Sequence, residues 1–278
     1  MKKDLDEKWL LEQAGDDDSR RAIETILQQR RQVYEHNRFY GGDDLLSLTL
    51  GSYRIWYREC SGFSTLEVYH EIFREDNHFL LPEFSSRGEK VIIDIGANEG
   101  FYALKIKVHN PDCRLICVEP NPYLFEVLQR NLDSNRIQNV TTVNKALAAE
   151  KGTARFEIIK QIGPIGGRDL KLVNRPWLKE EFIQMINVET ETIDELFLRF
   201  EIKEVGILKV DVEGMELDVL AGASNGLGGI HKIVIERHNR DLRDGVVNFL
   251  HSRNFRLVYE EDPELSRYYG DLYFIRQA

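Results

Sequence analysis

The sequence predicts a doubly wound α/β fold, in which a mostly parallel sheet carries helices on both faces. Four runs of apolar residues point to strands that are buried on both sides, as the strands of parallel sheets are. Segments with the spacing of amphipathic helices separate these runs. A chain of 278 residues has room for one such domain with an appended segment. The four runs cover residues 91–95, 115–118, 205–212 and 230–235.

The elements that follow residue 90 alternate between strand and helix. The first apolar run ends at Gly96, and the apolar side chains beyond it suit a crossover helix. Asn121 and Pro122 are typical of an N-cap and the first residue of a helix. The predicted elements are a strand at 91–95, a helix over 101–108, a strand at 115–118, a helix over 122–132 and a strand at 140–143.

The second half of the chain continues this alternation. Thr192 and Glu195 form a capping box before an apolar helix. Residues 153–159 alternate polar and apolar, which is typical of an edge strand or one arm of a hairpin. The last two strands lie close enough in sequence to be antiparallel, and they bring the sheet to about seven strands. The elements are strands at 205–212 and 230–235, a helix over 241–252, and strands at 255–259 and 272–275.

Residues 1–88 differ in pattern and predict an N-terminal α+β cap before a main domain at 89–278. Ser19 is the expected N-cap of the first helix. Two roles are open for the cap, closure over the active site and the interface of a homodimer. Residues 160–188 form a long irregular insertion, expected as a lid or an acceptor-binding loop. The cap is expected to hold a helix over 19–34, a hairpin near 46–60 and a helix over 65–73.

The composition excludes a general nucleic-acid-binding protein. The chain has 37 basic and 47 acidic residues and a net charge of −10, whereas a protein that tracks a phosphate backbone needs a basic footprint. No apolar run approaches the ~18 residues of a membrane span, and the charged N-terminus lacks the apolar stretch of a signal peptide. Three cysteines without paired spacing predict reduced packing residues and a cytoplasmic protein, these being Cys60, Cys113 and Cys117.

Residues at the ends of the first two strands of the main domain indicate a nucleoside site. Gly96, Asn98 and Gly100 form a G-x-N-x-G turn before a helix, where backbone N–H groups are available to a ligand. Asn98 stands where a pyrophosphate binder needs its second glycine, so the turn favours a ligand without pyrophosphate, such as S-adenosylmethionine. Glu119, at the tip of the next strand, could accept hydrogen bonds from both ribose hydroxyls, and Asp94 lies at the same sheet edge.

A second group of charged residues interrupts and follows the strand at 205–212. Asp211 and Glu213 stand at its carboxyl end, beside the expected ligand. Asp211 is the first candidate for a general base or acceptor-orienting group, and Glu213 would orient the acceptor or stabilise the loop. For Lys209 and Glu216 a structural role explains the residue as well as a functional role does. Lys209 would then form a Lys–Asp pair, and Glu216 would cap a helix.

His238 follows the strand at 230–235 on the same side of the sheet and is the second candidate base. Asp211, Glu236 and Asn239 could together hold a divalent metal, since their oxygens are suitable ligands. An ordinary solvated loop explains these residues better, so the sequence assigns no metal ligand.

Four segments of the chain resemble the FkbM family of S-adenosylmethionine-dependent methyltransferases. They cover residues 93–100, 118–121, 144–147 and 209–216, and the last of them is fairly specific to that family. The resemblance extends over residues 45–276 and implies a Rossmann-like sheet of seven strands with the last one antiparallel. It implies Asp94 to Gly100 around the methionine part of the cofactor, Glu119 on the ribose, and Ala146 and Leu147 beside the adenine. The cofactor-binding residues expected on this basis are Asp94, Gly96, Asn98, Glu99, Gly100, Glu119, Asn121, Ala146 and Leu147.

The resemblance implies a methyltransferase that acts on a hydroxyl group of a sugar or a natural-product small molecule, with amine and carboxylate acceptors also open. The catalytic residues expected are Asp211, Glu213 and His238. An anionic or ring-bearing acceptor could contact Arg168, Arg175 and Trp177, although an exposed loop with one buried Trp explains them equally well. Two alternatives are a nicotinamide-dependent oxidoreductase, which Asn98 disfavours, and a non-catalytic S-adenosylmethionine-binding protein, which the intact set of strand-end acids disfavours.

Overall fold

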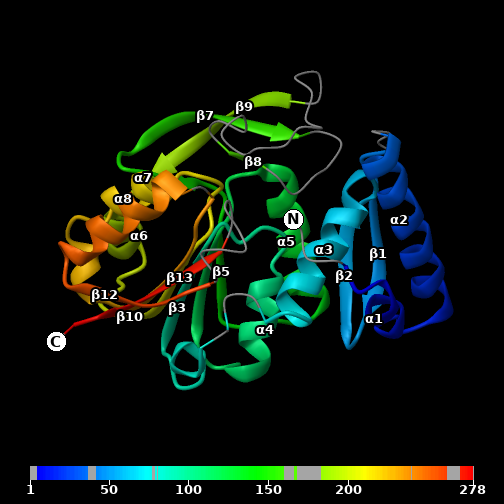
Figure 1. The fold of residues 1–278 in the computed structure, drawn as a ribbon, viewed down its shortest axis with the longest axis horizontal. Helices are drawn as coiled ribbons and strands as arrows, with labels where there is room; N and C mark the ends of the chain where they lie inside the picture. Colours follow the sequence, from blue (N-terminus) through cyan, green and yellow to red (C-terminus); the bar gives the residue numbers. More distant parts are fainter. Residues whose placement is uncertain are drawn as a thin grey trace.

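A computed structural model gives the structure of residues 5–36, 42–76, 79, 81–159, 166–167, 183–238, 240–261 and 270–277. Within these residues, seven strands form the main sheet in the order β12-β13-β11-β10-β3-β4-β5 (Figure 1). Neighbouring strands run parallel except for β13, which is antiparallel to both β11 and β12. The predicted Rossmann-like sheet is therefore confirmed. Its strands are β3 (Val91–Ile95), β4 (Arg114–Val118), β5 (Val140–Val143), β10 (Val205–Val210), β11 (Ile230–Glu236), β12 (Phe255–Glu260) and β13 (Asp271–Arg276).

Helices cover both faces of the sheet because alternate residues of its inner strands point to opposite sides. Ile92 and Leu115 belong to one buried cluster, whereas their neighbours Ile93 and Ile116 belong to another. Helices α4 and α5 contribute to the first cluster, and α6, α7 and α8 contribute to the second. The bounds of these helices are Phe101–His109 (α4), Pro122–Ser134 (α5), Ile193–Arg199 (α6), Glu216–Ala221 (α7) and Arg240–His251 (α8).

The N-terminal segment packs against the face that α4 and α5 cover (Figure 1). Ile23 and Leu66 from this segment lie in the same buried cluster as Leu104 of α4. The predicted helices and hairpin are present, and a short helix that the pattern does not predict, α1, precedes them. The elements are α1 (Glu7–Glu12), α2 (Asp17–His36), β1 (Leu45–Leu50), β2 (Tyr53–Arg58) and α3 (Gly62–Phe73).

The prediction that Ser19 caps the first long helix is wrong. Helix α2 begins at Asp17, and the Asp16 carboxylate accepts the Ser19 N–H at 2.6 Å. The Ser19 hydroxyl instead accepts the Thr49 N–H at 2.8 Å, which ties the helix to strand β1. Asp and Ser are equally good N-caps, so the neighbouring hairpin decides which of them takes that position.

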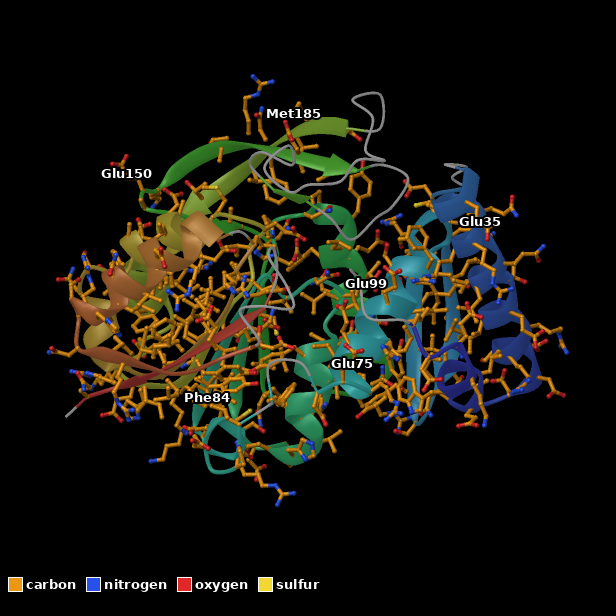
Figure 2. All side chains as sticks on the ribbon, in the orientation of Figure 1. Glu35, Glu75, Phe84, Glu99, Glu150 and Met185 are labelled. Atoms are coloured by element: carbon orange, nitrogen blue, oxygen red, sulfur yellow. The ribbon has the colours of Figure 1, made fainter. Side chains whose placement is uncertain are left out.

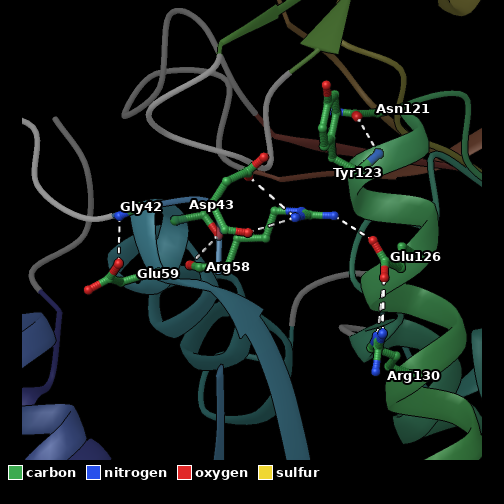
Figure 3. Close-up of polar contacts among 9 residues, drawn as sticks. Gly42, Asp43, Arg58, Glu59, Asn121, Tyr123, Glu126 and Arg130 are labelled. Carbon is green, nitrogen blue, oxygen red and sulfur yellow. Dashed lines mark hydrogen bonds and ion pairs between the residues drawn. The ribbon is translucent and has the colours of Figure 1, made fainter. Parts of the chain in front are cut away.

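The Arg58 side chain connects the hairpin to helix α5 (Figure 3). Its Nη2 donates to Glu126 Oε2 at 2.6 Å, and its guanidinium lies 5.1 Å from the centre of the Tyr123 ring. Its Nη1 donates to the Asp43 carbonyl at 2.9 Å. Tyr123 lies in the first turn of α5, which follows directly after strand β4. These contacts therefore link residues 42–58 to the carboxyl end of β4.

A smaller four-stranded sheet, again within the described residues, follows β5 and lies in the order β6-β9-β7-β8. Its strands are β6 (Ala146–Leu147), β7 (Gly152–Ile159), β8 (Gly166–Gly167) and β9 (Ile183–Glu191). Strand β7 pairs antiparallel with β9, so the predicted hairpin arm is confirmed. Residues 183–188 of the expected irregular insertion therefore belong to a strand, while 160–165 and 168–182 lie outside the described residues.

The three cysteines are buried and no disulfide joins them, as the sequence predicts for packing residues. In the part of the chain that the structure describes, no helix combines the length and the apolar character that crossing a membrane requires.

Candidate functional site

The loop after β3 lies against the loop after β10. Gly96 has a φ of +80°, and a Cβ added to it would lie 1.7 Å from the Asp211 carbonyl oxygen. The Asp211 N–H donates to the Ile95 carbonyl at 3.0 Å, which keeps the two loops in register. Only glycine allows this approach, so the Gly96 loop and the Asp211 loop form one surface at the carboxyl edge of the sheet.

Glu119 connects the same loop to the start of helix α5. Its Oε2 accepts the Asn98 N–H and its Oε1 accepts the Asn121 N–H, both at 2.9 Å. Burial raises the pKa of Glu119 to about 7, although these hydrogen bonds oppose the shift. Asn98 has a φ of +51°, a left-handed conformation that Asn tolerates better than most residues. Each Glu119 oxygen retains a lone pair beyond these contacts.

Glu99 is directed toward the N-terminal segment. Its Oε1 accepts a hydrogen bond from the Thr65 hydroxyl of α3 at 2.9 Å, and its backbone carbonyl accepts from Asn131 at 2.8 Å. The Asn131 side chain also accepts the Trp56 N–H from β2. Burial raises the pKa of Glu99 to about 8, with the Thr65 hydroxyl opposing the shift. Two residues of the N-terminal segment thereby fix the loop that was predicted to bind the cofactor.

This raised pKa predicts a pH-dependent effect of Glu99→Gln on stability. The pKa of Glu99 is higher in the folded chain than its ordinary value of 4.5. The contribution of Glu99 to the unfolding free energy of wild type therefore falls as the pH rises from about 5 to 8. The variant cannot titrate there, so its unfolding free energy relative to wild type should rise by up to ~1.4 kcal/mol per pH unit. Urea unfolding at pH 5, 6, 7 and 8 measures this difference.

Glu150→Gln is the control for that experiment, because Glu150 is an exposed carboxylate far from Glu99 (Figure 2). The difference in unfolding free energy between Glu150→Gln and wild type should stay constant across the same pH range. A constant difference for Glu99→Gln as well would show that Glu99 is ionised in the folded protein at neutral pH.

A buried ion pair lies beneath the two loops. Asp94 is fully buried, and Lys209 Nζ lies 3.1 Å from its Oδ1. The same Nζ donates to the Gly96 carbonyl at 3.2 Å and to Asp211 Oδ2 at 3.3 Å. Burial opposes the charge on Lys209, but Asp94 and Asp211 outweigh it and raise the Lys209 pKa. Lys209 therefore joins three predicted site residues, and the Lys–Asp pair considered from the sequence is present.

His238 lies among carboxylates at the ends of β10 and β11. Its Nδ1 is 2.7 Å from Oε1 of the fully buried Glu216. Its Nε2 is 3.7 Å from Asp211 Oδ1 and 3.6 Å from Glu213 Oε2. Burial lowers the pKa of His238, but Glu213, Glu216 and Glu236 outweigh it and hold that pKa well above its ordinary value. The structure thus brings together all three predicted catalytic residues.

Glu216 is the site residue to which the sequence assigned no functional role. Its Oε1 accepts the Gly214 N–H at 3.1 Å as well as facing His238. A first-turn carboxylate usually caps its own helix. The signal for a further role is its full burial, which a helix-capping acid at the surface does not require.

The structure gives the positions of other predicted site residues, whose roles stay predictions. Asn121 is buried, and its side chain accepts the Tyr123 N–H as the N-cap of α5, as predicted. Ala146 and Leu147 form β6, where they pair with Thr190 and Glu191 of β9. Outside the described residues lie Arg168, Arg175, Trp177 and Asn239.

Comparison with known proteins identifies the family. Residues 94–257 match the methyltransferase FkbM domain, which is more than half of the 278 residues. The chain belongs to the FkbM methyltransferase family. The matched region includes the Gly96 loop, Glu119 and the Asp211–His238 group, so the resemblance seen in the sequence is confirmed. It favours methyl transfer over the hydride transfer considered as an alternative.

Two relatives of this FkbM-family chain have informative names. The 31-O-demethyl-FK506 methyltransferase FkbM of Streptomyces tacrolimicus is 28% identical over 223 residues, which cover 70% of this chain and 84% of that protein. The hexuronic acid methyltransferase AglP of Haloferax volcanii is 28% identical over 206 residues, covering 70% and 80%. Among solved structures, M. jannaschii TYW2 in complex with AdoMet matches this chain with 10% identity, a TM-score of 0.45, and coverage of 86% of this chain and 89% of that chain.

Proposed function

We propose that this FkbM-family protein is an S-adenosylmethionine-dependent O-methyltransferase that acts on a hydroxyl group of a sugar or a related natural product. The main support is the contact between the Gly96 loop and the Asp211 loop, since it sets a carboxylate beside the expected cofactor. The names of FkbM and AglP support oxygen-bearing acceptors, since one is named for 31-O-demethyl-FK506 and the other for hexuronic acid.

The residues around the Gly96 loop fit this cofactor. Left-handed backbone at Gly96, Asn98 and Gly100 turns the chain tightly at the end of β3, where a methionine moiety would lie. Glu119 can accept a ribose hydroxyl with the lone pairs that its backbone contacts leave. The carboxylates at this sheet edge also suit a cationic sulfonium better than a phosphate.

The proposed chemistry assigns proton transfer to Asp211. When bound, S-adenosylmethionine supplies an electrophilic methyl group and retains the electron pair of the broken carbon–sulfur bond. Asp211 would orient the acceptor hydroxyl and accept its proton, a form of base catalysis that contributes ~10²–10⁴-fold. The Asp211 side chain is 25% exposed and that of His238 is 3% exposed, so Asp211 is the group that an acceptor can reach. Glu213, 22% exposed, lies beside it and can orient the acceptor.

Calorimetry with S-adenosylhomocysteine and with NAD tests the cofactor assignment. We expect S-adenosylhomocysteine to bind and NAD not to bind. Glu119→Gln should weaken the binding at least ~10-fold, because hydrogen bonds to a charged group contribute about 1.5–3 kcal/mol. Glu83→Gln, a change at an exposed glutamate, is the matched control. Binding of NAD alone would contradict the proposed function.

A screen of acceptors tests the reaction. Radiolabelled S-adenosylmethionine is incubated with hydroxyl-bearing glycosides, hexuronic acids and the matching amines. Label recovered as a methyl ether supports the proposal. Label recovered only on nitrogen or only as a methyl ester would contradict the assignment of a hydroxyl acceptor.

A further inference from the structure

We infer that Asp211, Glu236 and His238 form a binding site for a divalent transition-metal ion at the acceptor side of the active site. The inference rests on the proposed function for the role of the ion and deepens it. Asp211 follows β10, Glu236 ends β11, and His238 comes two residues later, so neighbouring parallel strands deliver all three groups to one edge.

The spacing of these groups suits a shared ion. One ligand atom from each residue lies within 4.8 Å of the others. Two atoms that bind one metal at 2.0–2.4 Å can be at most about 4–5 Å apart. The two Asp211 oxygens face different partners, since Oδ2 is 3.3 Å from Lys209 Nζ and Oδ1 faces His238 Nε2. The Oδ1 atom of Asp211 is therefore directed toward His238, on the side where an ion shared with His238 would lie.

The orientation of His238 is a second and independent observation. Its Nδ1 contacts the buried Glu216 carboxylate at 2.7 Å, and its Nε2 faces the carboxylates of Asp211 and Glu213. Metal-binding histidines commonly donate their other N–H to a carboxylate, which fixes the ring and directs the remaining nitrogen to the metal. Glu216 supplies this support from α7.

Glu216 also points to a positive charge in the group. It is fully buried, and its Oε2 makes no hydrogen bond within the described residues. Burying a carboxylate is costly unless a cation compensates for it. Two basic side chains face this group: Lys209 pairs with Asp211, and His238 faces Glu213 and Glu216. Three further carboxylates lie within electrostatic range, those of Glu236, Asp271 and Glu71. An ion bound by His238 and its neighbours would replace the proton on His238 Nε2 and add further positive charge to this group of carboxylates.

The ligand set indicates the kind of ion and its use. Imidazole suits Fe²⁺ or Zn²⁺ better than it suits Mg²⁺ or Ca²⁺, and the two carboxylates also suit Mn²⁺. Three protein ligands leave positions for two adjacent oxygens of an acceptor, such as a vicinal diol or a 2-hydroxy acid. With the ion bound, Asp211 would hold it instead of acting as the base, and the ion would ease loss of the acceptor hydroxyl proton, which Glu213 beside Asp211 can then accept.

Mn²⁺ binding to the metal-stripped full chain tests the inference, measured by electron paramagnetic resonance and calorimetry. Wild type should bind one Mn²⁺ per chain, and Glu236→Gln and His238→Asn should each weaken this binding at least ~10-fold. Glu216→Gln should weaken it as well, although Glu216 does not touch the ion. Glu150→Gln, remote and exposed, should bind Mn²⁺ like wild type.

S-adenosylhomocysteine affinity, measured on the same samples, separates the two proposals and shows that each variant is folded. Loss of Mn²⁺ binding with retained S-adenosylhomocysteine binding supports the metal site. Wild type that binds S-adenosylhomocysteine but no Mn²⁺ would overturn the metal site and leave the methyltransferase assignment intact. Mn²⁺ binding that is equal in wild type, Glu236→Gln and His238→Asn would also overturn it.

Discussion

Asp211→Asn is expected to lower methyl transfer by ~10²–10⁴-fold while S-adenosylhomocysteine affinity stays within about threefold of wild type. The change keeps the shape of the side chain but removes its negative charge. An amide cannot accept the acceptor proton, and it is a poorer metal ligand than a carboxylate. Backbone contacts to the Gly96 loop come from Asp211 N–H and C=O, which the substitution retains.

The assay compares single-turnover rates on an acceptor that wild type methylates, with calorimetry and thermal unfolding on the same samples. Asp112→Asn removes one exposed carboxylate beside the amino-terminal end of β4, at the opposite edge of the sheet, and should leave both quantities unchanged. Wild-type turnover in Asp211→Asn would refute the assignment of Asp211. A loss of S-adenosylhomocysteine binding in parallel with turnover would instead place Asp211 among the cofactor contacts.

Gly96→Ala is expected to destabilise the protein by more than ~3 kcal/mol and to abolish cofactor binding in the fraction that folds. The added Cβ would meet the Asp211 carbonyl oxygen at 1.7 Å, so one of the two loops must move. Movement of either loop also disturbs Lys209, which donates to the Gly96 carbonyl and the Asp211 carboxylate. Urea unfolding and calorimetry with S-adenosylhomocysteine measure the two effects.

Gly88→Ala is a close control for the backbone. Gly88 has a φ of +81° against +80° for Gly96, but a Cβ on Gly88 would meet no atom within 4 Å. Both variants carry the same conformational penalty of ~1–2 kcal/mol, so the difference between them isolates the steric clash. Equal destabilisation of the two variants would contradict the close packing of the Gly96 loop on the Asp211 loop.

The parts of the fold that follow from local patterns could be predicted. Apolar runs marked the central strands because both faces of each are buried, as Ile92 and Ile93 of β3 show. The N-cap of α5 and the capping box of α6 were also predictable, since each is made by residues close in sequence. Helix α1 was missed although Asp6 caps it, because six residues are too few for a clear periodicity.

Contacts between distant residues could not be predicted in the same way. The predicted cap at Ser19 failed because Thr49, on a strand 30 residues away, takes its hydroxyl. Glu99 is predicted as a cofactor contact from its place in the loop, and that role stays a prediction; what the sequence did not indicate is the contact of its carboxyl with Thr65 of α3. In both cases the side chain contacts an element that is distant in the sequence, which local patterns do not reveal.

The sequence by itself determined the α/β fold, the family, and the placement of Asp94, Glu119, Asp211 and His238 at strand ends, because hydrophobic periodicity and strand-end turns are local properties. Only the tertiary structure decided how these groups meet. Strand β10 lies between β3 and β11, and this order brings Lys209 to Asp94 and His238 to Asp211. Glu216 reaches His238 across 22 residues for the same reason. The balance of charge at the site depends on these pairings, since a buried carboxylate is stable only beside a cation or a donor.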